Sequence, residues 1–286
     1  MKISEWEQKG KHLNFKGYPI FFIKQDAEKE VLLCLHGFPT SSFDYHKIWG
    51  QLSERFSLIA YDMIGYGFSE KPADLNYTTF LQADLLEELV SFLKVEKLHI
   101  LSHDYGNTII QELLARREEG HLNFEIASIF MMNGALFPET HRPILAQKIL
   151  ISPVGFLFNR LATENRLKKS LASVFGKETQ PTNAELDDFL GIIKSGGGKK
   201  ITHKLIRYMS ERAVYRDRWV GALKRFEGKF RLMIGMDDPV SGAHLLKRFR
   251  EVMPDKEFIE IPGVGHFPHF EVPDTALRHF FDFHTD

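Results

Sequence analysis

Short apolar runs alternate with amphipathic stretches along much of this chain. Runs of strand length occupy residues 19–23, 31–35, 57–61, 98–101, 126–132, 230–234 and 257–261. Apolar residues at helical spacing lie between several of these runs, as at residues 80–93 and 242–252. Strands that alternate with helices predict a mostly parallel sheet with helices on both faces. Residues 13–23 contain no such helix, which predicts an antiparallel edge.

The alternation stops after Met132 and resumes at Phe230. Between these points, residues 135–222 follow helical and loop patterns. A helical block of this size between two strands of one sheet predicts a cap over the carboxyl ends of the strands, where ligands of such sheets bind. We therefore predict a core domain of residues 1–134 and 223–286, and a helical cap domain of residues 135–222.

The composition of the chain limits the partners and the cellular compartment that we expect for it. The 286 residues are 43% hydrophobic and 26% charged, as in a globular protein, and the formal net charge of -1 gives no electrostatic basis for binding nucleic acid or an anionic membrane. The single cysteine, Cys34, excludes an intrachain disulfide and suits a reducing cytoplasm. The N-terminus lacks a secretory apolar core, and no run approaches the roughly 18 residues of a membrane span. We expect a cytoplasmic protein without a membrane span.

The segment from Leu101 to Asn107 carries the strongest chemical signal. It joins an apolar run to a helical pattern, so it predicts a tight turn between a strand and a helix. Such a turn can present one side chain as a nucleophile at the edge of the sheet. The residue at its centre is Asp104, which favours attack on a saturated carbon, as in an epoxide or an alkyl halide. Ser102 lies two residues before the centre and is a weak alternative for ester hydrolysis.

Other polar residues also follow predicted strands. Backbone N–H groups of Phe38, after His36-Gly37, and of Tyr105 can stabilise a developing negative charge. The pair Asp237-Asp238 follows residues 230–234, and either carboxylate can orient a histidine base. His266 follows residues 257–261 within a Gly-x-Gly-His pattern, and the chain order of nucleophile, acid and histidine makes it the candidate base.

These segments resemble the α/β-hydrolase superfamily, and in particular its epoxide hydrolase and haloalkane dehalogenase branches, which use Asp as nucleophile. The resemblance implies an eight-stranded, mostly parallel sheet. A closer similarity is to mesoderm-specific transcript proteins and their relatives. The motifs that carry the superfamily resemblance are His36-Gly37-Phe38-Pro39, Asp62-x-x-Gly65-x-Gly67-x-Ser69, His103-Asp104-Tyr105-Gly106, Gly235-x-x-Asp238 and Gly263-x-Gly265-His266. Those that carry the closer similarity are Leu101-Ser102-His103-Asp104-Tyr105-Gly106, Phe137-Pro138-Glu139-Thr140-His141-Arg142-Pro143 and Arg218-Trp219-Val220-Gly221-Ala222-Leu223.

The resemblance implies a role for each matching residue. Asp104 is the nucleophile, Asp238 rather than Asp237 is the acid, and His266 is the base. Asp104 would form an alkyl–enzyme ester, and a water activated by His266 would hydrolyse it while the Phe38 and Tyr105 N–H groups hold the oxyanion. No cofactor and no metal are expected.

The substrate depends on how the leaving group is stabilised. Epoxide opening needs a proton donor, and the cap offers Tyr208 and Tyr215 as candidates. Halide release needs N–H donors, which the side chains of Phe38 and Tyr105 lack. An epoxide hydrolase-like enzyme acting on a small apolar substrate with water is therefore favoured, with a haloalkane dehalogenase as the alternative. A catalytically silent ligand-binding or interaction protein on this fold is a further alternative, and a monomer or homodimer is expected.

Overall fold

The computed structural model describes residues 1–285, without the side chains of residues 158–160. Across this range eight strands form one sheet in the order β1-β2-β4-β3-β5-β6-β7-β8. β1 pairs with β2, and β2 with β4, in antiparallel orientation. The other neighbouring strands of the sheet pair in parallel. The predicted sheet and its antiparallel edge are confirmed. The strands are β1 Lys11–Phe15, β2 Tyr18–Gln25, β3 Val31–Leu35, β4 Ser57–Tyr61, β5 Lys97–His103, β6 Glu125–Met132, β7 Lys229–Gly235 and β8 Glu257–Ile261.

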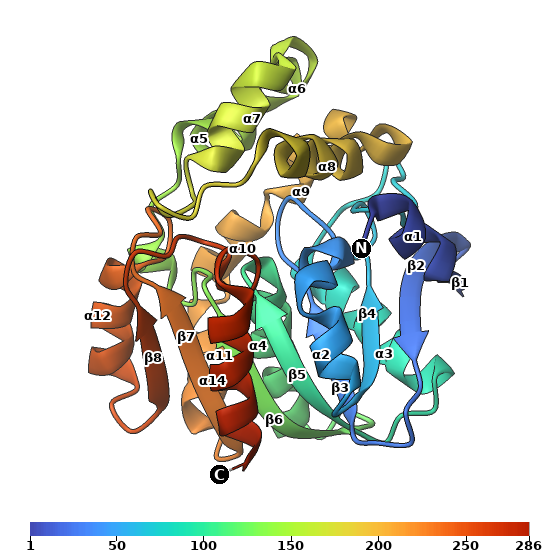
Figure 1. Ribbon diagram of the computed structural model, residues 1–286, viewed down its shortest axis with the longest axis vertical. Coiled ribbons are helices and arrows are strands. Elements are labelled where there is room, and N and C mark those ends of the chain that lie inside the picture. The colour runs from blue at the N-terminus through green and yellow to red at the C-terminus, as the bar shows by residue number, and fades with distance from the viewer. Residues whose placement is uncertain (286) are drawn as a thin grey trace.

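Helices cover both faces of this sheet (Figure 1), as predicted. One face carries α1 Ile3–Lys9, α2 Trp49–Ser53 and α14 Pro273–Thr285. The other face carries α3 Thr79–Phe92, α4 Tyr105–Glu118, α11 Arg216–Arg225 and α12 Ala243–Val252. Shorter core helices are η1 Ser42–Lys47 and α13 Pro268–Glu271.

Neighbouring residues of one strand enter different apolar layers because successive side chains of a strand point to opposite faces. On β3, Leu33 packs in the layer that contains α3 and α4, whereas Leu32 and Cys34 pack in the layer that contains α2 and α14. Since both faces are covered, the central strands are apolar along nearly their whole length. Cys34 is fully buried, and burial raises the pKa of its thiol, as expected for a structural cysteine.

The segment between β6 and β7 lies largely over the carboxyl edge of the sheet, at the top of Figure 1. Its elements are η2 Pro138–Thr140, α5 Leu145–Ile151, α6 Gly155–Leu161, α7 Glu164–Ala172, α8 Asn183–Lys194, η3 Ser195–Lys200, α9 Thr202–Leu205 and α10 Tyr208–Val214. The predicted domain boundary at residue 222 falls inside α11, which packs against α4 in the core layer. We retain the division into core and cap as a proposal, and these contacts favour placing α11 with the core.

An apolar cluster joins the cap to the loops after β7 and β8. Phe175 and Phe189 from the cap pack with Val240, Phe267 and Phe270 from the core. Val240 and Phe267 are close neighbours in sequence of Asp238 and His266, so the segment between β6 and β7 is anchored beside both of these residues. In the part of the chain that the structure describes, no helix combines the length and apolar character needed to cross a membrane.

Candidate active site

Asp104 occupies the sharp turn between β5 and α4. Its backbone has φ 47° and ψ -109°, a conformation that costs a non-glycine residue about 1–3 kcal/mol. The turn is held because the Asp104 N–H donates to the carbonyl of Asn133 at 2.7 Å. Its surroundings are tightly packed. A Cβ on Gly106 would lie 2.8 Å from the carbonyl oxygen of His36, and one on Gly37 would lie 2.5 Å from Asp104 Cβ, so glycine is required at both positions.

The two carboxylate oxygens of Asp104 have different surroundings. Oδ2 accepts the backbone N–H of Phe38 at 2.9 Å. Tyr105 begins α4 directly after Asp104, where the first N–H groups of a helix have no intrahelical acceptor. Oδ1 faces His266, with 3.9 Å between this oxygen and His266 Nε2. One oxygen is therefore held by a backbone donor, and the other lies towards the predicted base.

The structure brings Asp238 and His266 together beside Asp104. His266 Nδ1 lies 2.7 Å from Asp238 Oδ2, so its Nε2 is directed towards Asp104. Asp238 is buried and also accepts the Val240 N–H at 2.7 Å and the Ser241 hydroxyl at 2.6 Å. Its neighbour Asp237 is exposed. Of the two adjacent carboxylates, only Asp238 contacts His266.

The buried Asp238–His266 pair is strongly polarised. Burial opposes ionisation of Asp238 and by itself would raise its pKa. The charge and hydrogen bond of His266 outweigh this effect, together with hydrogen bonds from Ser241 and Asn133. The pKa of Asp238 therefore lies below its ordinary value. Burial likewise lowers the pKa of His266, but the charge and hydrogen bond of Asp238, followed by the charge of Asp104, raise it to about 9. A pKa of about 9 makes His266 a cation at neutral pH.

This raised pKa predicts that the folded state loses stability at alkaline pH. The pKa of His266 is 6.5 in an ordinary environment and about 9 in the fold, so its contribution is complete below pH 6.5 and is lost as the pH rises through 9. We expect the free energy of unfolding to fall by about 3 kcal/mol as the pH rises through that range, since each unit of difference between the two pKa values corresponds to about 1.4 kcal/mol. Urea titrations of the native chain and of His266→Gln measure this decrease. An equal decrease in the variant would assign it to another group.

Two residues at this site lack any assignment from the sequence. Asn133, after β6, donates from Nδ2 to Asp238 Oδ2 at 2.9 Å and to the Gly235 carbonyl at 3.1 Å. A polar residue directly after a buried strand was the only signal that could have indicated it. Arg212, on α10, is buried with its Nη2 4.0 Å from Asp104 Oδ1. A charged residue in an amphipathic segment usually lies at the surface, so the sequence did not indicate that Arg212 is buried.

The two candidate cap tyrosines lie in different places. Tyr208 is buried, its ring stacks on Tyr105 with 4.1 Å between centroids, and its hydroxyl has no partner in the described structure. Tyr215 is 37% exposed and packs edge-on against Phe80, 4.8 Å between centroids. The structure therefore places Tyr208 at the start of α10, beside Asp104, and Tyr215 directly after the end of this helix, at the surface.

Two other polar residues near the turn serve structural roles. The Ser102 hydroxyl donates to Asn107 Oδ1 at 2.7 Å within the turn. Asp62 accepts the N–H and hydroxyl of Ser42 at 2.8 and 2.6 Å, and the N–H of Phe68 at 2.7 Å. These bonds occupy the hydroxyl hydrogen of Ser102 and both oxygens of Asp62.

A buried cluster of Asp44, His103 and His269 lies behind His266, with candidate ligand atoms within 4.8 Å of one another. His103 Nε2 contacts the His266 carbonyl at 2.7 Å. Burial raises the pKa of Asp44 and lowers that of both histidines, that of His103 to about 3. These shifts favour the uncharged forms, so the cluster is suited to a neutral polar layer that supports His266.

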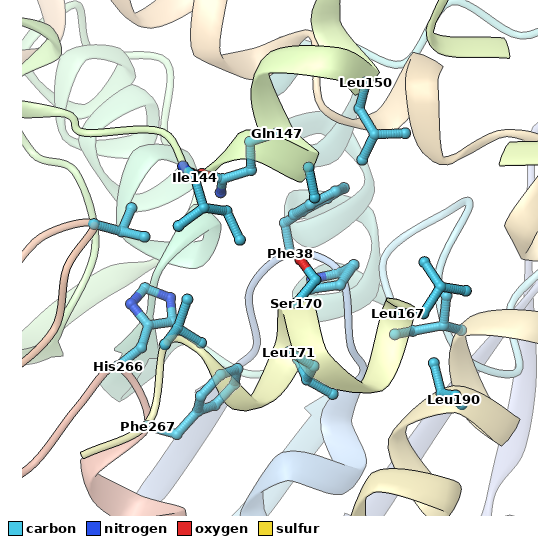
Figure 2. A pocket seen from close by; sticks show the side chains of 15 residues that line it. Phe38, Ile144, Gln147, Leu150, Leu167, Ser170, Leu171, Leu190, His266 and Phe267 are labelled. Atoms are coloured by element: carbon cyan, nitrogen blue, oxygen red, sulfur yellow. Dashed lines mark hydrogen bonds between the residues drawn. The ribbon is translucent and has the colours of Figure 1, made fainter. Parts of the chain in front are cut away.

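An apolar cavity leads to this site from beneath the helices between β6 and β7. Figure 2 shows labelled side chains of α5, α7 and α8 around it, with Phe38 and His266 also in its lining. The space between the lining atoms is about 690 Å³, part of it open to solvent. Its polar side chains are few. The lining residues are Phe38, Pro39, Ile144, Ala146, Gln147, Leu150, Leu167, Ser170, Leu171, Val174, Leu190, Ile193, Val240, His266 and Phe267.

The fold and the site define an α/β-fold hydrolase. The sequence profile of the α/β hydrolase fold family matches residues 30–273, and the chain belongs to this family. It is 35% identical to the mesoderm-specific transcript protein of Mus musculus over 297 aligned residues, which cover 98% of this chain and 87% of that protein.

Solved structures agree with this fold at lower sequence identity. A haloalkane dehalogenase from Agrobacterium tumefaciens superposes with a TM-score of 0.80 at 20% identity, and 97% of each chain is covered. The epoxide hydrolase CorEH has a TM-score of 0.75 at 18% identity, with 96% of this chain and 97% of that chain covered.

Proposed function

We propose that this chain is an epoxide hydrolase-like enzyme that works through an ester on Asp104. The observation that carries the proposal is the unequal placement of the two Asp104 oxygens. Oδ1 is free to attack a saturated carbon, while Oδ2 accepts the Phe38 N–H at 2.9 Å. Once Oδ1 is esterified, Oδ2 is the carbonyl oxygen, which becomes negative when water attacks. The donor is thus already at the atom that gains charge, an effect worth about 3 kcal/mol.

The first step opens the ring. A bond forms between Asp104 Oδ1 and the ring carbon, the carbon–oxygen bond breaks, and the departing oxygen takes a proton. Tyr208 supplies that proton in this scheme, because its buried hydroxyl has no partner in the described structure. Burial, with the charge of Asp104 second, raises the pKa of Tyr208, which keeps the hydroxyl protonated until the leaving group needs it.

The second step hydrolyses the ester. His266 Nε2 takes a proton from water, and the hydroxide attacks Asp104 Cγ. Collapse of the intermediate breaks the ester bond, and the proton of the new carboxylic acid passes to the departing alkoxide, which gives the diol and the Asp104 carboxylate. The proton held by His266 then returns through solvent to the Tyr208 phenolate, which restores both residues. Esterification removes the negative charge of Asp104, which is one of the causes of the raised pKa of His266. The pKa of His266 therefore falls when the ester forms, so the residue becomes a base at the step that needs one.

Oxygen is favoured over halide as the leaving group. At the two positions where donors to halide are expected, Phe38 has an apolar side chain, and the hydroxyl of Tyr105 pairs with Thr79 Oγ1 at 3.3 Å. The apolar cavity supports an apolar substrate. Haloalkane dehalogenation and ligand binding without turnover are the alternatives. We retain a cytoplasmic location and a monomeric or homodimeric state as proposals, and the single buried Cys34 supports a reducing compartment.

A panel of apolar epoxides and haloalkanes tests this function. We expect diol from at least one epoxide, and Tyr208→Phe is expected to slow that reaction about 100-fold because the proton donor is lost. Product analysis by mass spectrometry and halide titration measure the outcome. The matched control is Tyr215→Phe, which removes an exposed hydroxyl from the same cap region and should leave the rate unchanged. Halide release without diol would establish the dehalogenase, and ligand binding without any product would favour the silent protein.

A further inference from the structure

Arg212 is a buried cation beside the nucleophile that the proposed mechanism does not use. Its side chain is 3% exposed. Nε donates to Thr108 Oγ1 at 2.7 Å, Nη2 donates to the Asp104 carbonyl at 3.4 Å, and the guanidinium lies over the Tyr208 ring at 4.6 Å. The side chain is therefore held rigidly between the nucleophile turn and the cap.

The charge of Arg212 is incompletely matched. The nearest carboxylate oxygen, Asp104 Oδ1, is 4.0 Å from Nη2, beyond hydrogen-bond distance. Nη1 is buried and has no partner in the described part of the chain. Glu211, its neighbour in sequence, instead accepts the N–H and hydroxyl of Thr79 at 2.8 and 2.7 Å. A buried guanidinium with unused N–H donors costs free energy unless an anion completes it.

Two neighbouring groups also have unused hydrogen-bonding capacity. The Tyr208 hydroxyl is buried without a partner, as are both ring nitrogens of His141. Burial and the charge of Arg212 lower the pKa of His141 to about 4, so its neutral ring can donate one hydrogen bond. Three side chains from the segment between β6 and β7 thus have unsatisfied polar atoms near Asp104.

We propose that Arg212, together with Tyr208 and His141, forms a carboxylate-binding subsite next to Asp104, so that the substrate carries or releases a carboxylate close to the carbon that Asp104 attacks. The inference rests on the proposed function, which it deepens by naming the substrate class. A neutral epoxide needs only a proton donor. A guanidinium does not give up its proton in proteins, but its planar donors match a carboxylate.

The carboxylate has two possible sources. An epoxy acid carries it throughout the reaction. A strained four-membered lactone releases it: Asp104 Oδ1 bonds to the ring carbon, the alkyl carbon–oxygen bond breaks, and its electron pair stays on the new carboxylate without a proton transfer. In both cases the apolar cavity beneath the cap would hold the alkyl chain.

Equilibrium binding to Asp104→Asn tests the subsite without any turnover. This change removes the negative charge 4.0 Å from Arg212 and leaves the cation free for a ligand. We expect the variant to bind hexanoate about tenfold or more tightly than the isosteric neutral hexanamide, measured by calorimetry. Adding Arg212→Gln should abolish this preference, and adding Arg212→Lys, which keeps the charge, should retain part of it.

The matched control adds Arg207→Gln, which removes an exposed charge at the start of the same helix and should leave the preference intact. Thermal unfolding identifies which variants are folded. A folded Asp104→Asn protein without a preference for hexanoate, or a preference that survives Arg212→Gln, overturns the subsite.

Measurements of turnover then distinguish an epoxy acid from a lactone as the source of the carboxylate. With an epoxy acid, Arg212→Lys should raise KM and leave kcat nearly unchanged, because the charge is present before reaction. With a lactone it should lower kcat, because the charge develops only in the transition state. A carboxylate preference in a protein that turns over neither substrate supports the subsite and counts against the proposed ester mechanism.

Discussion

The His266→Gln variant is expected to accumulate an ester on Asp104 and to release product on the order of 10⁴-fold more slowly than the native chain. In the proposed mechanism the first step requires the Asp104 carboxylate but no base, so we expect it to proceed in the variant. The second step requires a proton acceptor for water, and glutamine cannot serve as one. His266 Nε2 faces Asp104 at 3.9 Å, so the missing base is the one directed at the ester.

Peptide mass spectrometry after incubation with a substrate epoxide measures this ester. The peptide that contains Asp104 should gain the mass of one substrate molecule. The control is His266→Gln combined with Asp104→Asn, which has no nucleophile and should show no adduct. An adduct on another residue, or rapid product release from the single variant, would exclude the ester mechanism.

The Glu112→Ala variant is expected to lose about 2–3 kcal/mol of unfolding free energy, because a buried donor left without its acceptor costs on the order of 1–3 kcal/mol. Glu112 lies on α4 with its side chain 1% exposed. It accepts Arg116 Nε at 2.9 Å, Arg218 Nε at 2.8 Å and Trp219 Nε1 at 2.8 Å, which joins α4 to α11. Alanine would leave the buried Trp219 Nε1 without its acceptor. It would also remove the pairing of α4 with Arg218 through Glu112, although Arg218 keeps Glu119 and Arg116 keeps Asp84 and Glu87. Both losses weaken the helix pair behind the turn at Asp104.

Urea denaturation followed by circular dichroism measures the loss. The matched control is Glu118→Ala, on the same helix, whose pairing with Arg225 at 2.7 Å is largely exposed to solvent. Its removal should cost no more than about 1 kcal/mol. Equal losses of unfolding free energy in the two variants would show that burial of Glu112 does not strengthen the contact between α4 and α11.

Much of the core could be predicted because its signals are local. The buried strands of a parallel sheet are short apolar runs, and the turn after each run carries its own polar or glycine signature. The carboxyl ends of β5, β7 and β8 share one edge of the sheet, so residues that follow these strands meet there whatever their separation in sequence. For this reason the proximity of Asp104, Asp238 and His266 could be expected from their order alone.

The cap residues could not be placed in the same way. Tyr208 and Tyr215 both lie in a helical segment at the end of the cap, and periodicity does not indicate which of them faces the core. Their positions follow from the packing of α10 against the turn at Asp104 and of α11 against α4. The same packing buries Arg212, which sequence pattern alone assigns to the surface.

The sequence by itself determined the fold family, the alternation of strands and helices, and the Asp at the centre of the turn between β5 and α4. Only the tertiary structure decided which oxygen of Asp104 accepts the Phe38 N–H, that Asn133 donates to Asp238, and that Arg212 rather than a second tyrosine lies beside Asp104. The physical reason is that strand-end positions are set by short-range hydrogen bonding within the sheet. The orientation of a cap side chain depends instead on contacts between segments roughly a hundred residues apart, which no local pattern encodes.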